Sequence, residues 1–245
     1  WIGTREEGLM YYDMPTGKLH RIPSKMFRHK MVYALLPVSG KLFIGSYGGL
    51  NIYDKTSHKL SSVSLPGMKY PIVNSLAYDV RNNCVWMGTD GKLLSYKLSS
   101  HDVEVVCEFP GCYLKSIVSD AQNNRLLIGT ETGVLDYQIA TGLIHKIEHD
   151  VHNPQSLCNN FISKLYQDAS NNLWVATDNG ISMIQQAPLI QDIKLTDFVD
   201  SRKGNLFTCM LHPSDKEYWL GGENGLLYVS EERTIWYCSN NLQYR

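Results

Sequence analysis

A short segment recurs six times along the chain, and this recurrence limits the fold more than any other feature of the sequence. Each copy is an apolar run, then a small residue, a polar residue and a turn that contains glycine. The copies are WIGTREEGL, LFIGSYGGL, VWMGTDGKL, LLIGTETGV, LWVATDNGI and YWLGGENGL, with the small residue at Gly3, Gly45, Gly88, Gly129, Ala176 and Gly221. Their intervals of 42, 43, 41, 47 and 45 residues are typical of propeller blades, which repeat about every 40 to 50 residues. The sequence therefore predicts an all-β protein, a β-propeller of four-stranded antiparallel blades with six repeats visible.

The third repeat shows the expected strands most clearly. We predict strands at residues 73–79, 84–89, 93–98 and 103–108, joined by polar segments that favour turns. The same division predicts the first strands of the neighbouring repeats at residues 32–37, 113–120, 161–168 and 206–212. The second strands are apolar almost throughout, as expected where both faces of a sheet are covered. Glycine or alanine at the small position indicates a bulge or a close approach of the neighbouring sheet.

The repeats predict one propeller domain over residues 1–245. The expected blade repeats are roughly 1–24, 25–66, 67–110, 111–149, 150–199 and 200–240. The first repeat lacks its first strand, and residues 241–245 resemble the start of a next one. Either residues 242–245 supply the missing strand and close a six-bladed ring, or the chain continues into further blades. The incomplete repeats at both ends favour part of a larger propeller, seven-bladed or double.

Charge and cysteine content exclude some classes of partner and leave others open. The net charge is −1 and the basic residues are scattered, so we expect no contact with nucleic acid or an anionic membrane. No apolar run reaches the roughly 18 to 20 residues of a membrane-spanning helix. The six cysteines have no zinc-type spacing, although Cys107 and Cys112 are near enough in sequence to form a disulfide in an oxidising compartment.

Strand parity sorts the loops onto two faces. In an antiparallel meander, the turns between second and third strands lie on the same face as the connections between blades. We call this the loop face, and variable loops on a regular scaffold are where binding usually occurs. Aromatic rings there can stack on sugar rings, and basic groups can pair with anionic glycans. The candidate ligand-binding residues are Arg5, Tyr47, Lys69, Tyr70, Asp90, Tyr113, Lys115, His152, Asn160, Asp178 and Arg202. Each alone is better explained as an inter-blade wedge or a solvated group, whereas together they favour binding.

Three aspartates, Asp79, Asp120 and Asp168, each precede an Asn-Asn pair at the same offset. A repeated calcium loop is one interpretation. Each copy offers only one carboxylate, however, whereas Ca²⁺ takes about six to eight oxygen ligands. Asp and Asn are also the residues that tight hairpins need, so we interpret the three segments as turns.

Metal binding and catalysis are not expected. His145, His149, Asp150 and His152 crowd into the longest connection, but their spacing fits no helical metal motif, and we expect no metal or cofactor. A glycan-cleaving propeller needs two carboxylates at a defined separation. None of the five visible first strands opens with an acid, so we expect no catalytic residue. A hydrolase or lyase is the weakest of the functional hypotheses.

The repeats resemble the two-component regulator propeller family. LWVATDNGI from Leu173 and LFIGSYGGLNIYD from Leu42 are similar to the strand and turn of that family, and HNPQSLCNNFISKLYQD from His152 is similar to its connector. The chain departs from the family pattern at Ala176, at Gly222 and at residues 90–92. The resemblance covers essentially the whole chain.

This resemblance implies the periplasmic sensor region of an inner-membrane hybrid histidine kinase of the Bacteroidetes type. Such regions sense breakdown products of complex glycans and switch on genes for their use. The implied partners are an oligosaccharide, neighbouring propeller and β-sandwich domains of the same protein, and a second copy in a homodimer. The alternative is a non-catalytic scaffold or dimerisation propeller whose ligand site lies elsewhere. No ligand residue is transferred, because the repeat motif of the family is structural.

Overall fold

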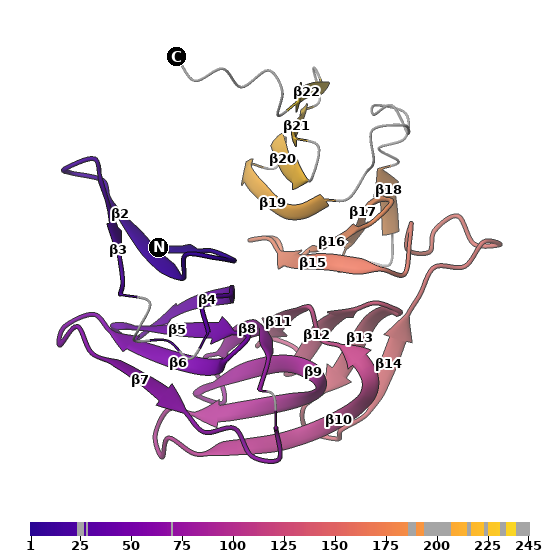
Figure 1. The fold of residues 1–245 in the computed structure, drawn as a ribbon. Helices are drawn as coiled ribbons and strands as arrows, with labels where there is room; N and C mark the ends of the chain where they lie inside the picture. Colours follow the sequence, from indigo (N-terminus) through magenta and orange to yellow (C-terminus); the bar gives the residue numbers. More distant parts are fainter. Residues whose placement is uncertain are drawn as a thin grey trace. The chain divides into compact units, whose positions relative to one another are not determined.

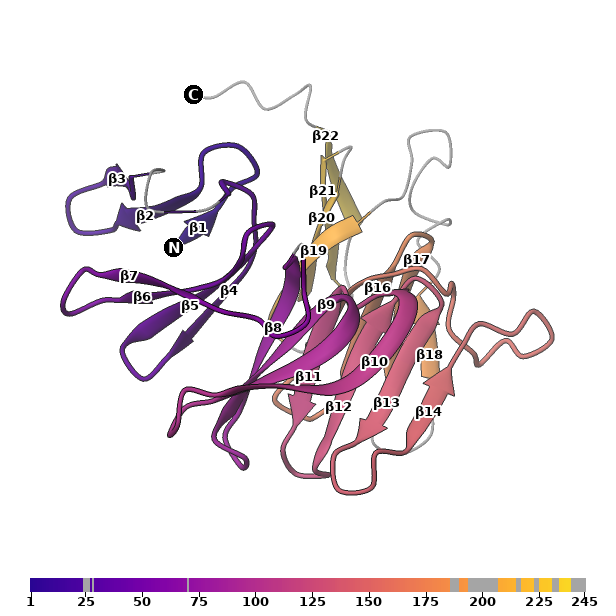
Figure 2. The ribbon, with the colours of Figure 1, turned by 60° about the horizontal axis from the view of Figure 1, so that its bottom comes forward.

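The computed structural model describes residues 1–23, 27, 29–69, 71–185, 190–193, 207–214, 217–222, 225–230 and 234–238. The regular elements are β-strands in six small antiparallel sheets (Figure 1 and Figure 2). This confirms the all-β class and the repeated small sheets expected from the sequence. No helix in the described part of the chain is long and apolar enough to cross a membrane. The chain divides into two compact units, unit 1 over Trp1–Asn124 and unit 2 over Arg125–Arg245.

Unit 1 contains the first three sheets and one further strand. The first sheet has the order β1-β2-β3, with strands Ile2–Gly3, Leu9–Asp13 and Lys18–Arg21. The second has the order β4-β5-β6-β7, with strands Val32–Val38, Lys41–Ser46, Gly49–Asp54 and Leu60–Val63. The third has the order β10-β9-β8, with β8 at Val73–Asp79, β9 at Cys84–Lys97 and β10 at Val103–Tyr113. Strand β11, Ser116–Asp120, follows at the end of the unit.

Unit 2 repeats the same antiparallel order. Strands β12, β13 and β14 are Arg125–Thr130, Gly133–Gln138 and Ile144–Ile147. The next sheet contains β15, β16, β17 and β18, at Ile162–Gln167, Leu173–Thr177, Gly180–Ile184 and Ile190–Ile193. The last contains β19, β20, β21 and β22, at Phe207–Ser214, Glu217–Gly222, Gly225–Ser230 and Thr234–Cys238. The predicted first strands are confirmed as β4, β8, β11, β15 and β19, except that β11 begins at Ser116 and not at Tyr113, which is the last residue of β10.

The third sheet differs from the prediction in two places. Strand β9 spans the predicted second and third strands without a break. It folds back on itself, because the Leu98 N–H, just after β9, donates to Asn83 O, just before it, at 3.2 Å. The predicted turn at residues 90–92 is therefore present inside one strand, where Gly91 has a φ of 85°. Strand β10 continues to Tyr113, past its predicted end at residue 108 and through the segment between the two predicted strands. The register shifts after Glu108, and beyond the shift Tyr113 of β10 pairs with Asp90 of β9, which explains why β10 extends this far.

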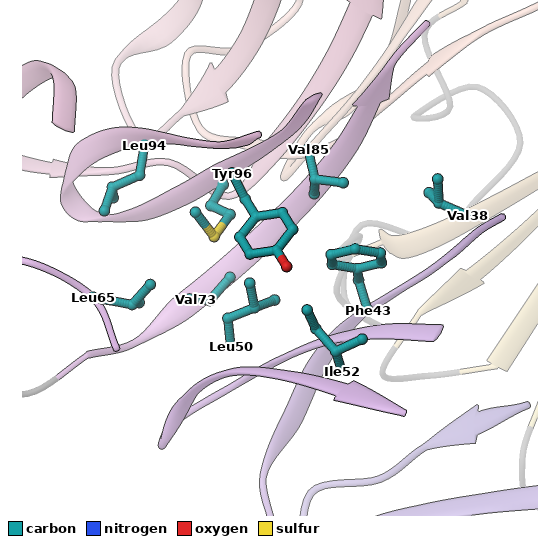
Figure 3. Packing of buried hydrophobic residues seen from close by; sticks show 10 residues of the cluster. Val38, Phe43, Leu50, Ile52, Leu65, Val73, Val85, Leu94 and Tyr96 are labelled. Atoms are coloured by element: carbon teal, nitrogen blue, oxygen red, sulfur yellow. The ribbon is translucent and has the colours of Figure 1, made fainter. Parts of the chain in front are cut away.

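The core lies between neighbouring sheets, as the apolar second strands predict. Between the second and third sheets, the rings of Phe43 and Tyr96 face each other at 5.5 Å in an edge-on arrangement (Figure 3). The buried residues around them come from both sheets and include Val38, Leu50, Ile52, Leu65, Val73, Val85, Met87 and Leu94. Strand β16 is buried at all its positions, and β5 and β12 are buried at all but their first. The expected cover on both faces is confirmed for these second strands, whereas β1 is exposed and β20 is mostly half-buried.

The small residue of the repeat lies where the following blade comes closest. A Cβ atom on Gly45 would lie 2.8 Å from the backbone oxygen of Val73, the first residue of β8. On Gly88 it would lie 2.7 Å from the backbone oxygen of Leu114, which leads into β11. Real Cβ atoms do not approach other atoms so closely, and a backbone oxygen of the tightly packed chain cannot move aside as the end of a flexible side chain can. The expected close approach of neighbouring sheets is thus confirmed at these positions.

The Asp-Asn-Asn segments are hairpin turns closed by their carboxylates. Asp168 Oδ1 accepts the backbone N–H groups of Ser170 and Asn172 at 2.9 and 2.8 Å. Asp168 Oδ2 accepts Asn172 Nδ2 and the indole Nε1 of Trp174, both at 2.9 Å. Burial alone would raise the pKa of Asp168, but the hydrogen bonds from Trp174 and Asn172 outweigh burial and lower it.

Related turns close two other blades, with the two Asn residues in exchanged roles. Asp79 accepts the N–H and side-chain amide of Asn82, the first Asn of its pair, whereas Asp168 bonds the second, and Trp86 Nε1 lies 3.1 Å from Asp79 Oδ2. The left-handed positions of the three turns are occupied by Asn83, Asn124 and Asn171, with φ values of 48°, 51° and 65°. Asn adopts this conformation more readily than most residues. The turn interpretation is confirmed, and hydrogen bonds from the turns engage these carboxylates.

The close contact between blades predicts that replacing a glycine of the repeat by alanine lowers the stability of the fold. We expect Gly88→Ala to lower the free energy of unfolding by about 1–3 kcal/mol, because the new methyl group overlaps the Leu114 backbone. Urea unfolding followed by circular dichroism measures this. Gly142→Ala is the matched control, since no atom lies within 4 Å of its added Cβ and only the φ of 71° opposes it. The left-handed backbone alone costs Gly142→Ala about 1–2 kcal/mol. An unchanged free energy of unfolding in Gly88→Ala would contradict the assigned inter-blade contact.

The Asp168 turn predicts a pH-dependent stability. Because the folded pKa lies below the unfolded value of about 3.9, the carboxylate stabilises the fold fully above that value and loses this effect as the pH falls through the folded pKa. We expect Asp168→Asn to destabilise the chain by about 1–3 kcal/mol at pH 7 and progressively less below about pH 4. Urea unfolding at several pH values checks this, with the exposed Asp102→Asn as control. A difference from the wild type that does not change with pH would refute the prediction.

Candidate ligand-binding face

Hydrogen bonds between loops support the predicted loop face. The Tyr47 N–H, just after β5, donates to Met31 O, just before β4, at 3.1 Å. The Asp178 N–H, just after β16, donates to Phe161 O, just before β15, at 3.2 Å. In both blades the turn after the second strand therefore lies beside the entry to the first strand, as strand parity predicts.

Exposed tyrosines mark the loop face of unit 1. Tyr47 and Tyr113, both predicted from the sequence, have 42% and 45% of their surface exposed. The Tyr47 ring lies 4.7 Å from the ring of His29. Tyr33, the second residue of β4, is 46% exposed and was missed by sequence reasoning. Exposed aromatic rings of this kind offer apolar faces with a polar hydroxyl at the edge.

The two described acidic candidates on this face are held by their own blades. Asp90 Oδ1 accepts Asn74 Nδ2 at 2.6 Å, and Asp178 Oδ1 accepts Ser163 Oγ at 3.3 Å. Asn74 and Ser163 are the second residues of β8 and β15, the position that Tyr33 occupies in β4. This repeat position was the available signal for all three residues. It places a polar pair at the loop face of two blades and an aromatic residue in another.

The basic candidates are spread along unit 1. Arg5 is exposed in the turn between β1 and β2, Lys69 is exposed ahead of β8, and Lys115 is half-buried ahead of β11. The aromatic candidate Tyr70 and the fourth basic candidate, Arg202, lie outside the described residues. The sequence prediction for these two side chains stays a prediction.

The long connection before β15 holds its own shape through side chains. Asn160 Oδ1 accepts the His149 N–H at 2.6 Å, and Ser156 Oγ accepts the Asp150 N–H at 2.8 Å. The His152 N–H donates to Asp150 Oδ1 at 2.9 Å. The amide oxygen of Asn160 is therefore used inside the loop, whereas the exposed side chain of His152 is displayed on it.

No group of three or more His, Cys, Asp or Glu side chains that could hold a metal ion occurs among the described residues. Cys107 and Cys112, for which the sequence left a disulfide open, are not joined in this structure. The loop face of unit 1 thus presents aromatic rings and hydrogen-bonded polar pairs, an arrangement suited to binding a hydroxyl-rich molecule.

Residues 156–179 match the family described as Two component regulator propeller. These residues include the end of the long connection before β15, together with β15 and β16. No curated protein matches the chain significantly in sequence.

Solved structures match the chain over nearly its whole length. An extracellular domain assigned to the hybrid two component system BT4673 from B. thetaiotaomicron matches with a TM-score of 0.71 and 31% identity, over 100% of this chain and 34% of that one. A corresponding domain of BT3049 from the same organism has a TM-score of 0.58 and 19% identity, over 97% of this chain and 37% of that one. The computationally designed protein Ika8 has a TM-score of 0.62 and 16% identity, over 93% of this chain and 66% of that one. The last two matches support the fold alone.

The chain spans about a third of the length of the two B. thetaiotaomicron domains that it matches. Repeat, sheet order and structural match agree with one another. The chain therefore carries a two component regulator propeller repeat within a β-propeller fold that it shares with the extracellular domains of hybrid two component systems.

Proposed function

We propose that this chain is a ligand-sensing part of the periplasmic region of a hybrid two-component protein. In this proposal a glycan breakdown product binds to the loop face, and the signal reaches a cytoplasmic histidine kinase that controls transcription. The likeness to extracellular domains of hybrid two component systems supports the setting. The chain itself carries out no catalysis.

The observation that carries the proposal is the set of exposed tyrosines on the loop face of unit 1. Tyr33, Tyr47 and Tyr113 keep between 42% and 46% of their surface exposed, although the sheets below them are tightly packed. Sugar rings present C–H faces that pack on aromatic rings, while the sugar hydroxyls need polar partners. The amide of Asn74 and the carboxylate of Asp90 supply such partners on the same face.

Sensing requires that the ligand prefer one arrangement of the protein to another. Turns and strand entries on the loop face are joined by backbone hydrogen bonds, as Tyr47 and Met31 show. A ligand that contacts a turn therefore acts on the edge of a packed blade. In the alternative, the chain is a scaffold or dimerisation propeller, and its tyrosines make no contribution to the ligand response.

Calorimetric titration of the complete sensor region with a panel of oligosaccharides tests the proposal. We expect one member to bind saturably, and Tyr47→Ala and Tyr113→Ala each to weaken its binding about tenfold through loss of a stacking surface. No product should form during the titration, as chromatography of the sugar can check.

Tyr12→Ala is the matched control, because Tyr12 is 52% exposed but lies on β2, near the turn to β3 on the other face. We expect this variant to bind like the wild type. Absence of saturable heat with every oligosaccharide would count against glycan sensing. Binding that survives both loop-face substitutions would instead support the scaffold alternative.

A further inference from the structure

Unit 1 has a groove at the face opposite the loop face. Its volume is about 580 Å³, within the range of about 300–1,000 Å³ that is common for small-molecule sites. It runs along the outer strands β6 and β7 of the second sheet and reaches Tyr96 and His101 of the third. Ser57, Lys59 and His101 lie in the turns between third and fourth strands, which parity assigns to this opposite face.

The lining of the groove is polar. Ser57, Ser61, Ser62 and Ser64 contribute to it. The hydroxyl of Ser61 donates to Ile52 O, that of Ser62 donates to Asn51 Oδ1 and that of Ser57 bonds Asp54, so Ser64 is the serine of this lining that offers its hydroxyl proton to a ligand. Two ammonium groups, those of Lys41 and Lys59, lie among them. Within the described part of the chain, neither lysine forms an ion pair within 4 Å. Such an open, polar lining does not suit an apolar ligand.

The acidic group of the lining is engaged by its own turn. Asp54 Oδ1 accepts the backbone N–H groups of Thr56 and Ser57 at 2.9 and 2.8 Å. The hydrogen bonds from Ser57 and Thr56, aided by the nearby charge of Lys41, lower the pKa of Asp54. This carboxylate is thereby used in shaping the turn, and two ammonium groups against one carboxylate leave the groove with an excess of positive charge.

A histidine is fixed at the end of the groove. The ring nitrogen Nδ1 of His101 is hydrogen-bonded to the hydroxyl of Tyr96 at 2.8 Å, and Tyr96 is buried. His101 has a φ of 64°; the corresponding turn of the second sheet has His58 at 55°, with its Nδ1 2.9 Å from the Tyr53 hydroxyl, and two other blades have Gly17 and Gly142 there. Left-handed backbone is unfavourable for a residue with a Cβ atom. The ring is therefore held in a set position, and its second nitrogen remains for a ligand.

We propose that this groove binds a tetrahedral oxyanion, the phosphate or sulfate ester group of a small hydroxylated molecule. Such a group has three terminal oxygens, which accept hydrogen bonds from ammonium, hydroxyl and imidazole N–H groups at once. Lys59 and Lys41 supply the charge, the Ser64 hydroxyl supplies a neutral donor, and His101 lies at one end. The site is separate from the loop face and does not depend on the function proposed for it.

Titration of the complete sensor region with glucose 6-phosphate, glucose 6-sulfate and glucose tests this site. We expect saturable binding of at least one ester, no binding of glucose, and weaker binding as the salt concentration rises. The ester that binds identifies the source of the oxyanion. Lys59→Ala and Lys41→Ala should each weaken binding about tenfold or more, through loss of a charge-assisted hydrogen bond.

Lys55→Ala is the matched control, because Lys55 lies in the same β6–β7 turn but does not line the groove. We expect this variant to bind the ester like the wild type, and thermal melting to show that all variants fold. Failure of both esters to bind, equal binding of glucose, or equal losses for Lys55→Ala and Lys59→Ala would overturn the proposal. Tyr47→Ala should leave ester binding unchanged, so the outcome is independent of loop-face sensing.

Discussion

The close approach of one blade to the next at the small residue of the repeat is the contact on which the rest of the structure depends. At Gly45 and Gly88, the space of a side chain is taken by the backbone of the following blade. Only this approach brings the faces of neighbouring sheets within the reach of Phe43 and Tyr96. Because the packed backbone of the next blade cannot move aside, this position must carry a residue with little or no side chain. The need for a small residue therefore recurs with the blade period.

Much of the fold was predictable because its determinants are local or periodic. The period gave the blades, and the chemistry of Asp168 with Asn171 gave a hairpin turn without knowledge of its neighbours. The site was less predictable. The pairing of Asn74 with Asp90 depends on a shift in the register of β8 against β9 between Val73 and Ser75. The shift recurs at the same repeat position in other blades, but the residue there differs from blade to blade, so the repeat marks the position and not its partner.

The candidate binding groups were predictable only as a face. Parity assigned Tyr47 to the loop face correctly, but it could not tell that the amide oxygen of Asn160 is used within its own loop. It also gave no reason to select Tyr33, or to expect Tyr96 to fix the ring of His101. These features depend on which side chains meet across turns of similar composition, and composition alone does not determine that.

The carboxylate turns also place two indole groups in defined surroundings. Trp86 in unit 1 and Trp174 in unit 2 are 4% and 2% exposed, and the Nε1 of each donates to an aspartate. Indole emission responds to water contact and to nearby charge, so each ring is a built-in optical label for its own blade. The chain has three other tryptophans, so variants that keep only Trp86 or only Trp174 would allow the loss of structure in each unit to be followed separately.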